Sequence, residues 1–156
     1  MTREEFVLIC FAPLDGKAIG PLHTQKLVFL VERRLEDYFQ RLFNFEAGDY
    51  GPFDKSVYRV LRDLQAKDDA ILSFPRSFEP TTYRLSVAGQ RRAEALVAPL
   101  PEKARDYLGK LGKWVYDLSF TSLLAAVNKA YPDFAYKSVF SRYEVAERAT
   151  PSATQD

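Results

Sequence analysis

A run of basic and aromatic residues between positions 54 and 67 contains the residue types best suited to a chemical role. The spacing of this run is helical, and one side of the predicted helix is apolar, formed by Val57, Val60, Leu61 and Leu64. The other side carries Lys55, Tyr58, Arg59 and Arg62. Lysine and arginine bind phosphate oxygens and guanine edges, while tyrosine contacts a sugar or a thymine methyl group. This face therefore predicts contact with double-stranded DNA.

Residues typical of catalysis or metal binding are few and isolated. Cys10 lies in an apolar helical pattern without a basic neighbour in sequence, which favours a buried small side chain over a nucleophile. His23 is the only histidine and stands at the start of a helix, where we expect a solvent-facing or capping role. Glu46 and Asp49 have no third ligand or positioned base, and we interpret them as loop carboxylates. We predict no catalytic residue, no metal and no cofactor, and we do not expect an enzyme.

The predicted helix over 54–67 is followed by a hairpin, which is the element order of a winged helix. Two strands, 70–74 and 82–85, flank a polar loop over 75–80. This loop carries Arg76, which would meet a phosphate if the loop acts as a wing. A plain exposed loop is the alternative.

Capping signals and apolar spacing predict the remaining elements. Helices are expected at 2–12, 24–42, 87–97, 102–118 and 120–131, and a half-buried strand is expected within 43–50. The predicted caps are Thr2, Asp54, Ser86 and Ser119. Glu32 and Glu36 are placed on the solvated side of the second helix. The predicted fold is mainly α with a small β-hairpin, and more specifically a winged helix-turn-helix with additional C-terminal helices.

The helix from about Ala104 to Leu118 has an apolar seam close to a three-four repeat. Its members are Ala104, Tyr107, Leu108, Leu111, Trp114, Val115 and Leu118. Such a seam packs either on its own chain or on a second copy. We predict a homodimer through this helix, with a core role inside one chain as the alternative.

Length and composition indicate one domain. The 156 residues are 47% hydrophobic and 28% charged, with a net charge of +1 and a single cysteine. We expect one winged-helix domain over 1–148, with a helical extension from about 99–148, and a disordered tail at 149–156. A lone cysteine forms no internal disulfide, and neither a signal peptide nor a long apolar run is present, so we expect a cytoplasmic protein with no membrane contact. The low net charge requires any basic footprint to be local.

Three stretches resemble a known family. They are Gln25-Lys26-Leu27-Val28-Phe29-Leu30, Tyr50-Gly51-Pro52-Phe53, and Tyr83-Arg84-Leu85-Ser86-Val87-Ala88-Gly89. This pattern, which covers residues 24–89, resembles the uncharacterised bacterial winged-helix proteins of the YwgA type, although Ser86 stands where threonine is usual. The later Tyr131-Pro132-Asp133-Phe134-Ala135 with Ser138 is similar to an ending of such proteins. Panacea-domain antitoxins share a related Gly-Pro turn and are a more distant match.

The resemblance implies a regulator that binds DNA or a protein partner, at a phage-defence or toxin-antitoxin locus. Two functions therefore stay open. In the first, the helix over 54–67 lies in the major groove and regulates transcription. In the second, the chain is a protein-interaction module, an antitoxin or an accessory subunit of a defence complex. The winged helix is then only a scaffold, and the aromatic C-terminal part binds a protein partner through residues such as Phe134, Tyr136, Phe140 and Tyr143. The basic helix face favours the first function, and the near-neutral charge favours the second.

Overall fold

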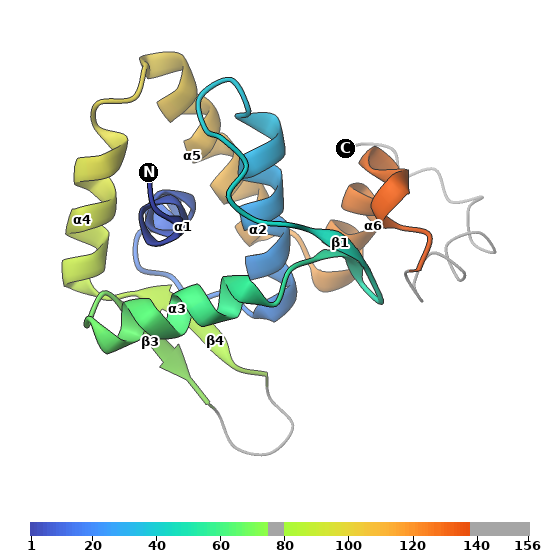
Figure 1. Cartoon of the computed structure of the whole chain (residues 1–156), viewed down its shortest axis with the longest axis horizontal. Coiled ribbons are helices and arrows are strands. Elements are labelled where there is room, and N and C mark those ends of the chain that lie inside the picture. Colours follow the sequence, from blue (N-terminus) through green and yellow to red (C-terminus); the bar gives the residue numbers. More distant parts are fainter. Residues whose placement is uncertain (75–79, 138–156) are drawn as a thin grey trace.

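Six α-helices and two short antiparallel hairpins form the part of the chain that this computed structural model describes, residues 1–74 and 80–137 (Figure 1). The helices are α1 (Arg3–Phe11), α2 (Pro21–Arg34), α3 (Ser56–Ala66), α4 (Val87–Val97), α5 (Glu102–Asp117) and α6 (Phe120–Ala130). The strands are β1 (Glu46–Gly48), β2 (Gly51–Phe53), β3 (Ala70–Ser73) and β4 (Thr82–Leu85). Two single turns of 3-10 helix, η1 (Ala12–Leu14) and η2 (Pro132–Phe134), follow α1 and α6. The prediction of a mainly helical chain with a small hairpin is confirmed.

Helix α1 is the centre of the core, with α2, α3, α4 and α5 around it (Figure 1). All six residues from Phe6 to Phe11 are fully buried, as expected for a helix that is apolar on every side. The predicted cap Thr2 forms a capping box with Glu5, in which the backbone N–H of Glu5 donates to Thr2 Oγ1 at 3.1 Å and the Thr2 N–H donates to Glu5 Oε1 at 2.9 Å.

Helix α3 and the hairpin β3–β4 lie where the apolar spacing predicts them. The apolar face of α3 is buried, and β3 pairs with β4 from Ala70 opposite Leu85 to Ser73 opposite Thr82. The structure adds a third backbone segment to this sheet. Ile19 forms an antiparallel bridge with Tyr83, the Ile19 N–H donating to Tyr83 at 2.9 Å and the Tyr83 N–H donating to Ile19 at 2.8 Å.

Helix α2 ends earlier than predicted, and one of its two expected solvent-facing carboxylates turns inward. It begins at Pro21, directly after the cap residue Gly20, and ends at Arg34 rather than near Leu42. Glu32 was expected in solvent but is fully buried. Its Oε2 accepts hydrogen bonds from the backbone N–H groups of Leu42 at 3.0 Å and Phe43 at 3.1 Å. The backbone N–H groups of Leu42 and Phe43 can reach Glu32 Oε2 only if the chain leaves the helix and folds back.

The aromatic stretch after α2 contains a strand, but the strand belongs to a second hairpin that the sequence did not reveal. Phe43 and Phe45 are buried as expected, whereas the strand itself is only β1. It pairs with β2 through a turn in which Gly51 has a positive φ of 83°. Pro52 therefore sits in a short edge strand, where proline is tolerated.

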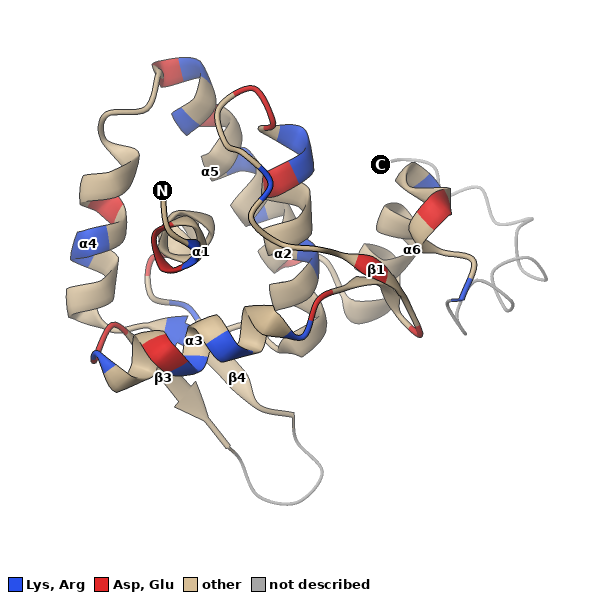
Figure 2. Ribbon diagram, viewed as in Figure 1, with Lys and Arg blue, Asp and Glu red and all other residues tan. Residues whose placement is uncertain are grey.

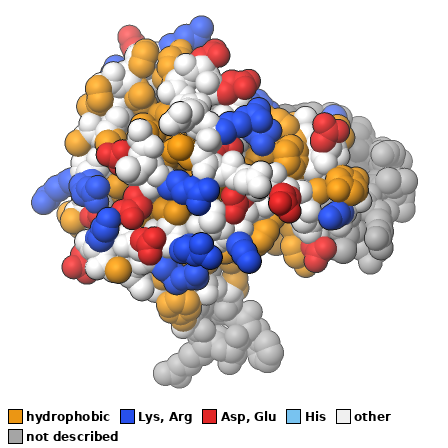
Figure 3. Space-filling model, in the orientation of Figure 1, with side chains coloured by type: hydrophobic (Ala, Val, Ile, Leu, Met, Phe, Trp, Pro, Cys, Tyr) orange, Lys and Arg blue, Asp and Glu red, His pale blue; other side chains and the backbone are white. Residues whose placement is uncertain are grey.

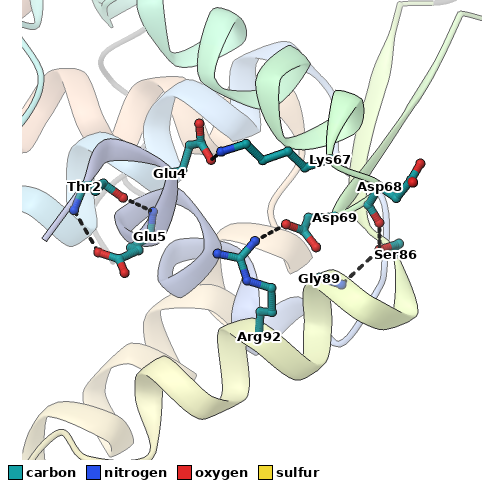
Figure 4. A network of polar contacts seen from close by, with 9 residues as sticks. All are labelled: Thr2, Glu4, Glu5, Lys67, Asp68, Asp69, Ser86, Gly89 and Arg92. Carbon is teal, nitrogen blue, oxygen red and sulfur yellow. Dashed lines mark hydrogen bonds and ion pairs between the residues drawn. The ribbon is translucent and has the colours of Figure 1, made fainter.

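A polar network joins α1, α3, β3 and α4 (Figure 4). The Ser86 N–H donates to the Asp69 carbonyl at 3.0 Å, and the Ser86 hydroxyl donates to the Asp68 carbonyl at 2.7 Å while it caps α4 at Gly89. Arg92 forms an ion pair with Asp69, and Lys67 forms one with Glu4 at 2.8 Å. The network holds the end of α3 and the start of the hairpin at a defined angle to α1.

The apolar seam of α5 packs inside this chain. Ala104, Leu108, Leu111 and Val115 are buried, and α5 contacts α2 and η1. The burial of these four residues supports the core role over the dimer interface for this part of the seam. Ser119 caps α6 as predicted, through the Ser122 N–H at 3.2 Å.

Some predictions fall on residues outside the described ranges, namely the loop with Arg76, the stretch from 138 to 148 and the tail at 149–156. Within the described ranges, none of the helices combines the length and the apolar character that crossing a bilayer requires.

Candidate nucleic-acid interface

The outward face of α3 carries the cations that the sequence singles out. Lys55, Arg59 and Arg62 are all exposed, and none of them forms an ion pair with another described residue. Figure 2 shows basic residues along α3 with an acidic residue among them, and Figure 3 shows basic side chains gathered over this part of the surface with carboxylates between them. The three cations are thus available to an anionic ligand, although the nearby carboxylates confine their positive electrostatic potential to a small area.

Tyr58 differs from these three, because its side chain is engaged within the chain. Its ring stacks on Tyr83 with centroids 5.6 Å apart and planes 13° apart. Its hydroxyl donates to the Pro21 carbonyl at 3.3 Å, and burial raises the pKa of Tyr58 to about 12. The structure therefore gives Tyr58 a positioning role, holding α3 against β4 and the start of α2.

Phe53 lies in the candidate interface, although it was not among the residues predicted from the sequence to contact DNA. It is the last residue of β2, three positions before the start of α3, and 41% of its surface is exposed. Its ring lies against Tyr58 with centroids 6.0 Å apart and planes tilted by 59°. The sequence feature that could have pointed to Phe53 is a large aromatic residue beside the start of a basic helix. Because Phe53 follows Gly51 and Pro52, it was interpreted only as part of a turn.

A buried glutamine of α2 fixes the start of α3. The Gln25 side-chain amide makes two hydrogen bonds to one residue, with Nε2 donating to the Asp54 carbonyl at 3.0 Å and Oε1 accepting from the Asp54 N–H at 3.0 Å. The neighbouring Lys26 donates from Nζ to the Pro52 carbonyl at 3.0 Å. We call these two side chains the α2 clamp. Because the clamp holds the backbone on both sides of Phe53, it sets where α3 begins.

The Asp54 carboxylate accepts a hydrogen bond from the first backbone N–H of α3, although the N-cap position of this helix is Lys55 rather than the predicted Asp54. Oδ1 accepts from the Ser56 N–H at 2.8 Å and from the Ser56 hydroxyl at 2.7 Å, and Oδ2 accepts from the Asn44 N–H at 2.7 Å. Burial by itself would raise the pKa of Asp54, but these hydrogen bonds outweigh it and lower the pKa. The Asp54 carboxylate is therefore ionised, and its oxygens accept hydrogen bonds from the Asn44 and Ser56 N–H groups.

Lys26 is an unusual member of the α2 clamp because it is a buried cation. Only 1% of its surface is exposed, and none of the ion pairs between described residues includes it. Burial lowers the pKa of Lys26 to about 7. The sequence feature that could have pointed to the α2 clamp is the pair of adjacent polar residues, Gln25 and Lys26, inside an apolar helical pattern. Polar groups at such positions are buried and need hydrogen-bond partners.

The remaining chemically active side chains have structural surroundings. Cys10 is buried as predicted, and burial together with the nearby Glu32 raises the pKa of its thiol. His23 was expected in solvent or at a cap, but it is half-buried, and its Nε2 lies 2.7 Å from the Leu118 carbonyl, linking α2 to the end of α5. Among residues 1–74 and 80–137, no three His, Cys, Asp or Glu side chains lie close enough to hold a metal ion.

No protein-family profile matches this chain, and no curated protein shows significant sequence similarity to it. The basis for a function is therefore the chain's own geometry.

Proposed function

We propose that this chain is a DNA-binding winged-helix regulator of transcription that contacts double-stranded DNA through α3. The observation that carries the proposal is the exposed set Lys55, Arg59 and Arg62 on the outward face of a helix that directly precedes a hairpin. A recognition helix presents such a face to the major groove. Lysine and arginine supply contacts to phosphates and to guanine edges.

The order of the elements supports the same class. A winged helix runs from a first helix through a short strand to two further helices and a hairpin. Here α1, the Ile19 bridge, α2, α3 and β3–β4 follow in that order, and the bridge adds a third strand position beside β4. The loop with Arg76 occupies the place of the wing in the sequence.

The connection between α2 and α3 is longer than the usual turn of three or four residues in a helix-turn-helix. It runs from Leu35 to Lys55 and contains β1 and β2. The α2 clamp and the Glu32 carboxylate attach this connection to α2 at both of its ends. These bonds give the long connection the rigidity that a short turn has by length alone.

The test is selection of duplexes from a random-sequence library by the intact chain, followed by anisotropy titrations with the selected duplex. The double variant Arg59→Ala, Arg62→Ala should weaken binding by about 1–3 kcal/mol for each arginine that makes a bidentate base contact. Where the lost contact is to phosphate, the slope of log affinity against log salt should fall by about one unit.

A matched control removes the same charge from a different element. Lys103 and Lys110 are exposed on α5, and alanine at both should leave affinity within about twofold once salt is fixed. Equal binding by the folded α3 double variant and the parent protein would show that α3 is not the contact surface. Failure to select any duplex at low salt would end the DNA proposal.

A second candidate function is a protein-interaction module, an antitoxin or accessory subunit, and a separate surface favours it. Tyr50 and Phe120 are 51% and 46% exposed, and their rings meet edge to face with centroids 5.8 Å apart. Exposed aromatic pairs are typical anchors of protein interfaces. Alanine at both positions should abolish binding of a purified cognate partner, whereas the α3 double variant should not.

A further inference from the structure

Phe53 is exposed but held in place from three directions. The Pro52 carbonyl before it accepts from Lys26, and both backbone groups of Asp54 after it bond to Gln25. Its ring rests on Tyr58, which is stacked on Tyr83. A side chain fixed in this way loses little conformational freedom when it makes a contact.

The charges around Phe53 differ on its two sides. Lys55 and Arg59 lie on the α3 side, where a phosphate is favoured. On the other side, the exposed Glu46 is the residue directly opposite Phe53 in the register of β1 and β2. A carboxylate disfavours a nearby phosphate, so the position of Glu46 favours contact of Phe53 with base edges over contact with the DNA backbone.

We propose that Phe53 contacts a thymine 5-methyl group in the major groove and thereby sets a preference for thymine at one position of the site. The thymine methyl is the apolar group on base edges, and apolar side chains such as phenylalanine recognise it there. The inference rests on the proposed contact of α3 with DNA, because Phe53 lies three positions before the first residue of that helix. It adds an apolar base contact to a surface whose other proposed DNA contacts are made by cations.

The test replaces thymine by deoxyuridine, one position at a time, in the duplex selected by the parent protein. This change removes one methyl group and keeps base pairing. At one position the parent protein should lose about fourfold in affinity, since one buried methyl contributes about 0.8 kcal/mol. Phe53→Ala should bind the thymine and deoxyuridine duplexes equally at that position while keeping the salt slope of the parent.

Two further variants separate recognition from a structural effect. Phe53→Leu retains an apolar side chain and should keep part of the thymine preference, and it serves as the test variant if Phe53→Ala does not fold. Tyr50→Ala removes a comparably exposed aromatic residue at the β1–β2 turn and should keep the full preference.

Three results would overturn the inference. They are indifference of the parent protein to deoxyuridine at every position, an unchanged thymine preference in Phe53→Ala, and a Phe53→Ala defect confined to binding a protein partner. In each case the loss of affinity in the α3 double variant still reports on the proposed function. A parent protein that selects no duplex removes the proposed function itself, which keeps the two failures distinct.

Discussion

Three buried polar side chains of α2 bond to the backbone of the segment that follows it. Gln25 binds Asp54, Lys26 binds Pro52, and Glu32 binds Leu42 and Phe43. Each would cost free energy if it were buried without a partner, and so would the backbone groups that it satisfies. The bonds therefore make the shape of the α2–α3 connection depend on residue identity at these three positions.

Lys26 gives the stability of the protein a defined dependence on pH. Its pKa is about 7 when folded and 10.5 in the reference state, so the unfolded chain binds more protons between these values. The free energy of unfolding should therefore rise with pH in this window, by on the order of 1–2 kcal/mol from about pH 7 to about pH 8.5. Urea unfolding at the two pH values measures it.

Lys26→Met is the control, because it keeps the length of the side chain and removes its titration. The rise between the two pH values should disappear in this variant, even though the Pro52 carbonyl loses its donor. The window stops near pH 8.5 because the raised pKa of the buried Cys10 thiol acts in the opposite direction at higher pH. An equal rise in the variant and the parent would assign the effect to another group.

At the scale of elements, two glycines inside helices have opposite roles. A Cβ on Gly89 of α4 would lie 1.9 Å from the Asp69 carbonyl oxygen, so this glycine permits α4 to approach the start of β3. A Cβ on Gly109 of α5 would meet nothing within 4 Å. Replacing each glycine with alanine therefore distinguishes the effect of the close approach of α4 to β3 from the effect of helix propensity.

Gly89→Ala should destabilise the protein by about 1–3 kcal/mol despite the better helix propensity of alanine, because α4 must move away from β3. Gly109→Ala should stabilise it by up to about 1 kcal/mol. Thermal and urea unfolding of both variants measure the difference. A stabilised Gly89→Ala protein would mean that α4 does not lie against Asp69 as closely as described.

At the scale of the whole molecule, the seam of α5 closes the core of one chain. Leu108 is buried within this chain, where α5 lies against α2. Leu108→Ala should therefore cost about 2–5 kcal/mol of unfolding free energy, and the loss should be the same over about a hundredfold range of protein concentration. A loss in Leu108→Ala that grows with protein concentration would instead place the seam at a subunit interface.

A homodimer stays a prediction, and it needs a surface other than the buried part of this seam. The reason for expecting one is electrostatic, since a net charge of +1 leaves a single copy few phosphate contacts. Light scattering of the parent protein with and without the selected duplex measures the number of copies bound.

The sequence by itself determined the local elements of this protein. Thr2, Ser86 and Ser119 cap helices where they were expected, and the apolar spacing of α3 and the strands β3 and β4 was correct, because these features depend on residues a few positions apart. The basic face of α3 follows from the same local periodicity.

Only the tertiary structure decided which polar residues are buried and what they bind. Glu32 looked like part of a solvated charge pattern, and the adjacent polar residues Gln25 and Lys26 did not indicate which backbone groups they would bond. Likewise, the apolar spacing of the α5 seam in the sequence is equally compatible with a dimer interface and with the core of one chain. Burial, the Ile19–Tyr83 bridge and the exposure of Phe53 all depend on contacts between residues far apart in the chain, which periodicity along the sequence does not encode.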